Sequence, residues 1–319
     1  MASTTGFPTT GTRTALHREI QKFLADNPSL HLGGEEDFHG ERRDHLQVFG
    51  FHSIPEEKRH PIHEVEFTAI GGPHGTIPIR VFYPKSAPET GKGGNAALIY
   101  FHGGGYTVGS VDEFENGLRL LAEESGVQVY GIDYRLAPEF RFPTQLDEYS
   151  ALIDALQGDF GASRGVAKDK VFGGGDSAGG DMTAAIALRR RDSELPNLAG
   201  QMLYYPEARL PFDTPAATEN NTGLYLECDG IFSFADHYLP RGVAPGFKYF
   251  SPGMQSLEYL KGVPPARVYT SRKAGNDVQW RHYDHMTHGW LQMTAWSLEA
   301  TKAVKESARD LREMAYEKS

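Results

Sequence analysis

The sequence predicts an α/β protein in which a mostly parallel sheet is covered by helices on both faces. Continuous apolar runs of strand length, such as 96–101 and 127–132, alternate with segments whose apolar residues recur at helical spacing. Parallel strands need a long crossover, which a helix usually supplies. A further run, 170–180, joins a short apolar strand to helix-forming residues through a glycine-rich turn. With 319 residues, the chain fits a single domain, 1–319.

Each strand is expected where an apolar run is bounded by glycine, proline or polar residues. These runs are 62–70, 76–83, 96–101, 127–132, 171–172, 198–205, 268–270 and 278–283. Helical spacing covers 16–24, 114–121, 146–156, 182–191 and 300–311. The helix over 114–121 is preceded by Ser110 and Glu113 at capping-box spacing and is closed by Gly126.

Two stretches, about 1–60 and about 206–250, do not follow the alternation. The first carries one amphipathic helix, which Asn27-Pro28 ends, followed by a charged segment with scattered aromatic residues. The second combines aromatic residues, turn residues and an apolar segment around 231–234. We expect the second stretch to be an insertion over the carboxyl edge of the sheet.

The composition limits which kinds of partner and which cellular compartment are consistent with the sequence. The formal net charge is −10 and no dense basic run is present, which argues against nucleic acid as a partner. Cys228 is the only cysteine, so an intrachain disulfide is excluded and nothing indicates an oxidising compartment. No apolar stretch approaches the length of a membrane span. The sequence therefore predicts a cytoplasmic protein and leaves a homodimer open.

The glycine-rich turn fits the nucleophile elbow, Gly175-x-Ser177-x-Gly179, in which a sharp strand-to-helix turn exposes a serine. A serine hydroxyl needs a base, and His288 follows the last expected strand, where this chain order places it. Donors for an oxyanion are available from the amide of Ala178 and from the glycine run at Gly103 and Gly104.

Four motifs together resemble the hormone-sensitive-lipase group of α/β-hydrolases, over about residue 60 to the C-terminus. They are His102-Gly103-Gly104-Gly105, Gly175-Asp176-Ser177-Ala178-Gly179, Tyr134-Arg135-Leu136-Ala137-Pro138-Glu139 and His288-Gly289. The resemblance implies the α/β-hydrolase fold, with Ser177 as nucleophile and His288 as base. It also implies Gly103, Gly104 and Ala178 as oxyanion donors. By the same resemblance, about 1–60 and about 206–250 would form a cap over the site.

The acid that orients the histidine in this group is missing from its usual place. That place is a loop and helix after the strand ending at Ser271, whereas here six residues lead to Val278. A parallel crossover needs at least about 10 to 12 residues. Either the given sequence omits residues, which we prefer because the surrounding pattern is intact, or the protein truly lacks the segment. A third explanation is an acid from another strand end, with Glu207 the best placed and Asp277 weaker.

Two other kinds of site were weighed against this interpretation. Gly173-x-Gly175-x-x-Ala178 partly fits a dinucleotide fingerprint, but that motif should open the first βαβ unit and here it opens a late one. His282, His285 and His288 are spaced by three, yet on a strand running into a loop this spacing does not place them on one face. We expect neither a metal nor an organic cofactor.

The function predicted from these residues is a serine carboxylesterase that hydrolyses short to medium acyl esters through an acyl-serine intermediate. Its partner would be a small-molecule ester. The alternative is a catalytically impaired or small-molecule-binding homologue that lacks the triad acid. Lactone or amide cleavage uses the same residues and stays open.

Overall fold

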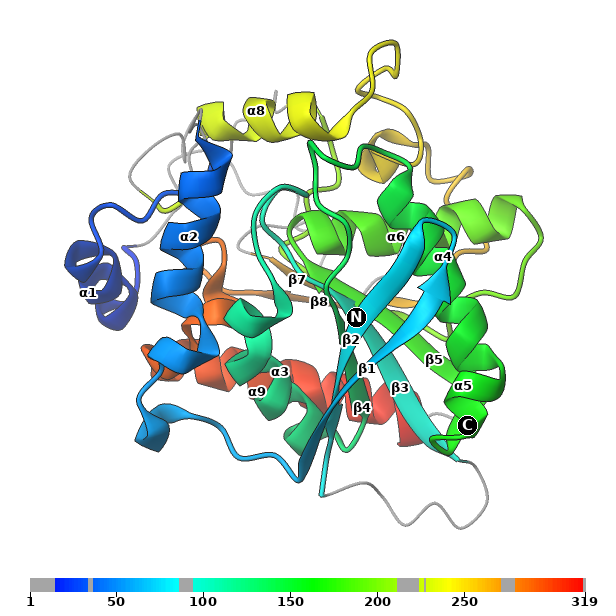
Figure 1. Ribbon diagram of the computed structural model, residues 1–319, viewed down its shortest axis with the longest axis horizontal. Helices are drawn as coiled ribbons and strands as arrows, with labels where there is room; N and C mark the ends of the chain where they lie inside the picture. Colours follow the sequence, from blue (N-terminus) through cyan, green and yellow to red (C-terminus); the bar gives the residue numbers. More distant parts are fainter. Residues whose placement is uncertain are drawn as a thin grey trace, which may run out of the picture.

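The computed structural model describes residues 15–33, 37–85, 94–210, 224–226, 228–270 and 279–317. Its centre is an eight-stranded sheet in the order β1-β2-β4-β3-β5-β6-β7-β8 (Figure 1). The strands are β1 Glu64–Gly72, β2 Gly75–Tyr83, β3 Asn95–Phe101, β4 Gln128–Ile132, β5 Val166–Asp176, β6 Gln201–Tyr204, β7 Ala266–Thr270 and β8 Gln279–His282.

Most of the sheet is parallel, as the sequence predicts. Every pair from β4 through β3, β5, β6, β7 and β8 runs parallel. The first two strands form the expected hairpin, in which Gly72 is the partner of Gly75, and β2 then joins β4 in an antiparallel pair. The carboxyl ends of the parallel strands therefore lie along one edge of the sheet, which is where α/β proteins place their sites.

Helices cover both faces of this sheet (Figure 1). The α-helices are α1 Arg18–Asp26, α2 Phe38–Phe49, α3 Val111–Ser125, α4 Thr144–Gln157, α5 Asp159–Ala162, α6 Ala178–Asp192, α8 Cys228–Tyr238 and α9 Leu298–Arg312. Short 3₁₀ turns are η1 Phe51–Ser53, η2 Glu56–Lys58, η3 Pro252–Met254 and η4 Trp290–Ala295, and a π-helical turn, η5, covers Glu313–Glu317.

The central strand β3 shows why both faces of the sheet are buried. Its side chains alternate between the two sides because successive residues of a strand point to opposite faces. Leu98 and Tyr100 pack with α3 and α9, whereas Ile99 and Phe101 pack with α4 and α6. The continuous apolar run in the sequence is therefore that of a strand with no solvent-facing side.

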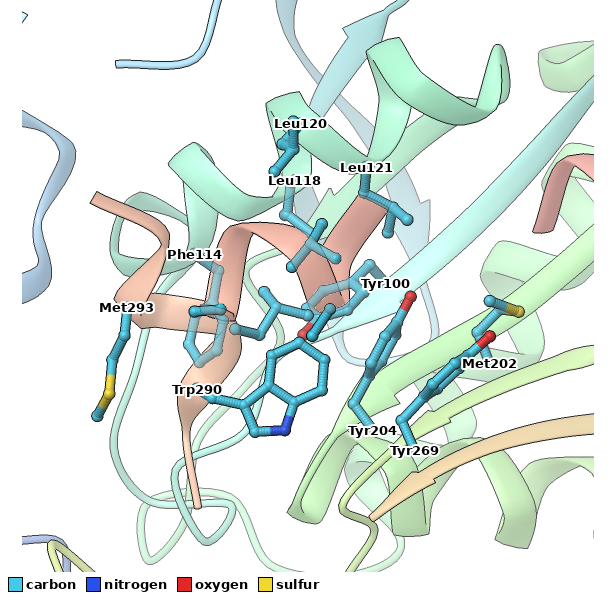
Figure 2. Packing of buried hydrophobic residues seen from close by; sticks show 14 of the residues in the cluster. Tyr100, Phe114, Leu118, Leu120, Leu121, Met202, Tyr204, Tyr269, Trp290 and Met293 are labelled. Atoms are coloured by element: carbon cyan, nitrogen blue, oxygen red, sulfur yellow. The ribbon is translucent and has the colours of Figure 1, made fainter. Parts of the chain in front are cut away.

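An aromatic cluster lies beneath the start of η4, on the face covered by α3 and α9. Trp290 is 1% exposed, and Figure 2 shows it among Tyr204, Tyr269 and Phe114. The ring centroids of Trp290 and Tyr204 are 6.0 Å apart in an edge-on arrangement, and those of Tyr204 and Tyr269 are 5.0 Å apart and stacked. Packing of this kind fixes the chain on either side of residue 290.

The loop after β3 receives contacts from both stretches that lie outside the alternating pattern. Arg42 of α2 donates from Nε to the carbonyl of Thr107 at 2.7 Å. From α8, Tyr238 stacks on Tyr106 with 3.8 Å between ring centroids. A Cβ added at Gly105 would lie 2.1 Å from the ring of Phe234. Helices α2 and α8 therefore hold the segment 104–107 from two directions.

The turn between β5 and α6 depends on glycine for steric reasons. A Cβ at Gly179 would lie 1.8 Å from the carbonyl oxygen of Phe101, and a Cβ at Gly175 would lie 2.4 Å from the same atom. The end of β5 and the start of α6 thus approach the backbone of β3 more closely than any side chain allows. These two glycines therefore permit the close packing of strand and helix.

We predict that Gly179→Ala lowers the free energy of unfolding by about 3 kcal/mol, because overpacking against a backbone carbonyl cannot be relieved by rotating a side chain. This exceeds the gain of about 1 kcal/mol that alanine brings to a helix. Gly71→Ala is the matched control, because its added Cβ meets nothing within 4 Å. Its expected effect is at most about 0.5 kcal/mol. Denaturant unfolding of both variants measures the difference, and equal effects would contradict the steric argument.

Candidate active site

Ser177 occupies the tip of the turn between β5 and α6. Its backbone has φ 51° and ψ −120°, a strained conformation for a residue with a side chain, and α6 begins at the next residue. The turn is held by the Ser177 carbonyl, which accepts from the amides of Asp181 and Glu207 at 3.0 and 3.1 Å. These features are those of a nucleophile elbow, as the sequence predicts.

His288 lies within hydrogen-bond distance of the serine. Its Nε2 is 2.7 Å from Ser177 Oγ, although the two residues are 111 positions apart in the chain. Desolvation lowers the pKa of His288 to about 4. At neutral pH the imidazole is therefore uncharged, and an unprotonated Nε2 can accept the serine proton.

Packing holds the histidine in this position. The ring centroids of Tyr205 and His288 are 4.8 Å apart. The hydroxyl of Tyr205 accepts a hydrogen bond from the amide of Leu291 at 3.2 Å. Tyr205 also contacts Trp290 edge-on, at 5.4 Å between centroids. The histidine loop is thus anchored to the end of β6 and to the aromatic cluster beneath η4.

The glycine loop after β3 differs from the prediction at one residue. The amide of Gly103 donates to Asp176 Oδ1 at 2.7 Å, so its single hydrogen is not available to an oxyanion. Within the described residues, the amides of Gly104, Gly105 and Ala178 have no acceptor. Gly103 is therefore corrected from an oxyanion donor to a bracing residue. The sequence argument did not include the free amide of Gly105, because a run of three glycines does not show which amides are already bonded.

Three motif residues brace the loops of the site by hydrogen bonds. Asp176 accepts from Tyr100 Oη at 2.7 Å as well as from Gly103, and desolvation raises the pKa of Asp176 to about 7. His102 Nδ1 lies 2.8 Å from the carbonyl of Gly103. Glu139 accepts a bidentate pair of hydrogen bonds from Arg42, at 2.7 and 2.8 Å, and these bonds lower the pKa of Glu139.

The acid that would orient His288 is not found in the described part of the chain. Among the described residues, the side chain of His288 hydrogen-bonds only Ser177. Glu207 instead lies near Asp181: desolvation, followed by the charge of Glu207, raises the pKa of Asp181, and desolvation raises the pKa of Glu207 itself to about 8. The structure therefore does not support Glu207 as the orienting acid. Asp277 and the segment 271–278 lie outside the described residues.

The strands on either side of that segment are nevertheless parallel neighbours. Thr270 at the end of β7 is the register partner of His282 at the end of β8. The short connection, 271–278, does not prevent the parallel pairing. The small number of residues between β7 and β8 therefore bears on the crossover that connects the two strands and not on their pairing.

Ser177 and His288 line a small cavity with a volume of about 10 Å³, the room of roughly one water molecule. Four polar residues that the sequence argument did not assign to the site also line it: His45, Glu113, Tyr225 and Gln292. They come from α2, α3, the segment 224–226 and η4. No sequence period links them, and Glu113 had been interpreted as a capping residue.

The capping-box interpretation holds only in part. Ser110 is the N-cap of α3, as expected, but its hydroxyl donates to Glu113 Oε1 at 3.1 Å and caps no backbone amide. Glu113 is 4% exposed and is one of the residues that line the cavity.

Metal-ligand clusters and membrane-spanning helices are both absent from the residues that the structure describes. Among them, no three histidine, cysteine, aspartate or glutamate side chains gather in a way that could hold a metal ion. His282 contacts Asp284, its neighbour along the chain. None of the described helices has both the length and the apolar character that crossing a membrane requires.

Comparison with known proteins gives concordant results. Residues 98–273 match the model of a family described as having the alpha/beta hydrolase fold. The chain is 30% identical to the esterase LipI of Mycobacterium tuberculosis over 67% of its length, and 32% identical to the carboxylic ester hydrolase LipN of the same organism over 72%. The aligned region spans 66% and 65% of these two relatives, just under two thirds of each.

A solved structure, the hyperthermophilic esterase from the archaeon Pyrobaculum calidifontis, superposes with a TM-score of 0.82. It is 26% identical, and the superposition covers 95% of this chain and 99% of that one. The fold and these sequence matches agree with the four motifs. The chain therefore belongs to the α/β-hydrolase family and, within it, to the hormone-sensitive-lipase group.

Proposed function

We propose that the protein is a serine carboxylesterase. The observation that carries the proposal is the 2.7 Å separation of His288 Nε2 from Ser177 Oγ at the tip of a strained elbow. A base within hydrogen-bond distance is what turns a weakly nucleophilic hydroxyl into an attacking group. The relatives named as esterases and carboxylic ester hydrolases support the same reaction class.

In the proposed mechanism, Ser177 Oγ attacks the ester carbonyl while its proton moves to His288 Nε2. The carbonyl oxygen becomes an oxyanion, which accepts hydrogen bonds from the amides of Gly104, Gly105 and Ala178. The imidazolium then returns the proton to the departing alcohol oxygen, leaving an acyl-serine. Water attacks the acyl-serine by the same sequence and regenerates Ser177.

Short acyl groups are the substrates best supported by the cavity. The volume of about 10 Å³ beside the serine is the room of one water molecule, so a short acyl group requires the least widening of this cavity. Medium chains would require movement of the segments that contact the glycine loop, 1–60 and 206–250, which we propose to act as a cap. The cytoplasmic location and a homodimer stay predictions from the sequence.

One observation favours a second candidate, a catalytically impaired or small-molecule-binding homologue. Within the described ranges no carboxylate hydrogen-bonds His288. Loss of the triad acid alone lowers turnover by roughly 10⁴-fold in serine proteases, and the remaining activity comes from the oxyanion donors and binding. Such a protein would still place substrate against Ser177.

We predict that Ser177→Ala lowers kcat for 4-nitrophenyl acetate by about 10⁴-fold or more, because no other group supplies the nucleophile. Ser163→Ala is the matched control, since its exposed hydroxyl bonds only to nearby residues of the chain: it donates to the carbonyl of Phe160 and accepts from Arg164 Nη1. In parallel, a fluorophosphonate should add to Ser177 of the wild type, as read by peptide mass. Unchanged turnover in Ser177→Ala would contradict the esterase mechanism, and no adduct on the wild type would favour the binding homologue.

The pH dependence follows from the lowered pKa of His288. The neutral imidazole is the active form, so kcat/KM is retained above the pKa and lost as pH falls through it. Because desolvation lowers that pKa from 6.5 to about 4, the acid limb should lie well below pH 6.5. Asp277→Asn should leave unchanged the pH at which kcat/KM falls on the acid side. A limb at or above pH 6.5 that Asp277→Asn moves downward would instead show that a carboxylate from 271–278 supports the histidine.

A further inference from the structure

Glu113 lines the catalytic cavity, and one of its carboxyl oxygens has no hydrogen-bond partner among the described residues. Glu113 is the third residue of α3 and is 4% exposed. Its Oε1 accepts from the hydroxyl of Ser110 at 3.1 Å. Its Oε2 is buried and has no hydrogen-bond partner among the described residues. Ser177 and His288 line the same cavity, so Glu113 belongs to the wall of the space that holds the reacting groups.

Three further polar side chains contribute to the wall of this cavity. The hydroxyl of Tyr225 donates to Gln292 Oε1 at 3.5 Å and lies 3.4 Å from His45 Nδ1, both at the long limit of a hydrogen bond. All three residues line the cavity together with Glu113. A purely alkyl group in this space would leave the Glu113 oxygen unsatisfied, whereas an oxygen substituent would pair with it.

The protonation of Glu113 determines what it can bind. Desolvation, together with the charges of Asp112, Asp133 and Asp176, raises the pKa of Glu113 to about 8. At pH 7 the carboxyl is therefore neutral. Because Oε1 accepts from Ser110, the proton belongs on Oε2, which can donate to an oxygen acceptor. A neutral acid offers no charge to an ammonium group, so an oxygen-bearing ligand fits best.

We propose that Glu113 is a specificity-determining residue that donates a hydrogen bond from Oε2 to a hydroxyl or ether oxygen next to the scissile ester group. The favoured substrates would be short esters that carry such an oxygen, in preference to plain alkyl esters of the same size. The cavity volume of about 10 Å³ matches a group the size of one water molecule, such as a hydroxyl. This inference rests on the proposed esterase function.

The test compares two pairs of esters that differ by a hydroxyl in place of a methyl group. Phenyl glycolate against phenyl propionate places the hydroxyl on the acyl side, and 2-hydroxyethyl acetate against propyl acetate places it on the alcohol side. Each kcat/KM is divided by the rate constant for hydroxide hydrolysis of the same ester, which removes the difference in intrinsic reactivity. The wild type should prefer the hydroxyl member of one pair by at least about tenfold, and that pair identifies the side that enters the cavity.

Variants then assign the preference to Glu113. Glu113→Leu should reduce it to within about twofold, whereas Glu113→Gln should keep most of it, because the amide NH₂ donates from the same place. Glu124→Leu is the matched control: Glu124 is exposed on the same helix, pairs with Lys305, and should leave the preference unchanged. Each ratio is measured within one preparation, so a reduced folded fraction cancels.

The outcomes separate the two proposals. Equal normalised rates for both members of both pairs in the wild type would overturn the inference even if Glu113→Leu failed to fold. A preference that survives in Glu113→Leu would overturn it as well. In both cases, loss of turnover in Ser177→Ala would leave the esterase function intact. Absence of any Ser177-dependent turnover of the four esters would overturn the esterase function and the inference with it.

Discussion

The close approach of the carboxyl ends of β3 and β5 is the constraint on which the site depends. At this point the carbonyl of Phe101 lies where side chains at Gly175 and Gly179 would have to be. The bond from Gly103 to Asp176 then ties the glycine loop to the end of β5 at 2.7 Å. Because both the elbow and the loop start from this junction, the serine and the remaining free amides keep a fixed relation to each other. Preorganised donors of this kind do not have to reorient when charge develops.

Burial without a countercharge gives the site its electrostatic character. Desolvation raises the pKa of Glu113 to about 8 and that of Asp176 to about 7, and it lowers the pKa of His45 to about 4. Most ionisable groups of the cavity are therefore uncharged near neutral pH. An oxyanion that forms there is a new charge in a region of low dielectric, where amide donors act more strongly than in water. The same burial makes an unpaired polar group such as Glu113 Oε2 costly, which is why we assign it to the substrate.

The sequence predicted the parts of the site that lie in contiguous motifs. A strand, a glycine turn and a helix in succession leave few geometries, so the conformation of Ser177 followed from local pattern, and His288 followed from chain order. Gly103 was assigned wrongly because the choice among three successive amides depends on Asp176, which lies 73 residues away. Glu113 was interpreted from its spacing to Ser110 alone, although its burial against the cavity depends on tertiary packing. His45, Tyr225 and Gln292 come singly from separate segments, and no local pattern connects such residues.

A triad acid usually does two things for the histidine: it orients the imidazole and it stabilises the imidazolium. Around His288 these two roles are separate. Orientation of the imidazole is supplied here by packing, since Tyr205 contacts the ring and Trp290, two residues later, is 1% exposed in the aromatic cluster. Stabilisation of the imidazolium is a different requirement, which apolar packing cannot meet. Lowering the pKa of His288 from 6.5 to about 4 disfavours the charged ring by roughly 3 kcal/mol. Without a carboxylate, that free energy is added to the barrier for proton transfer from Ser177. The geometry of attack can therefore be intact while the rate still depends on whether residues 271–278 bring a negative charge to the imidazole.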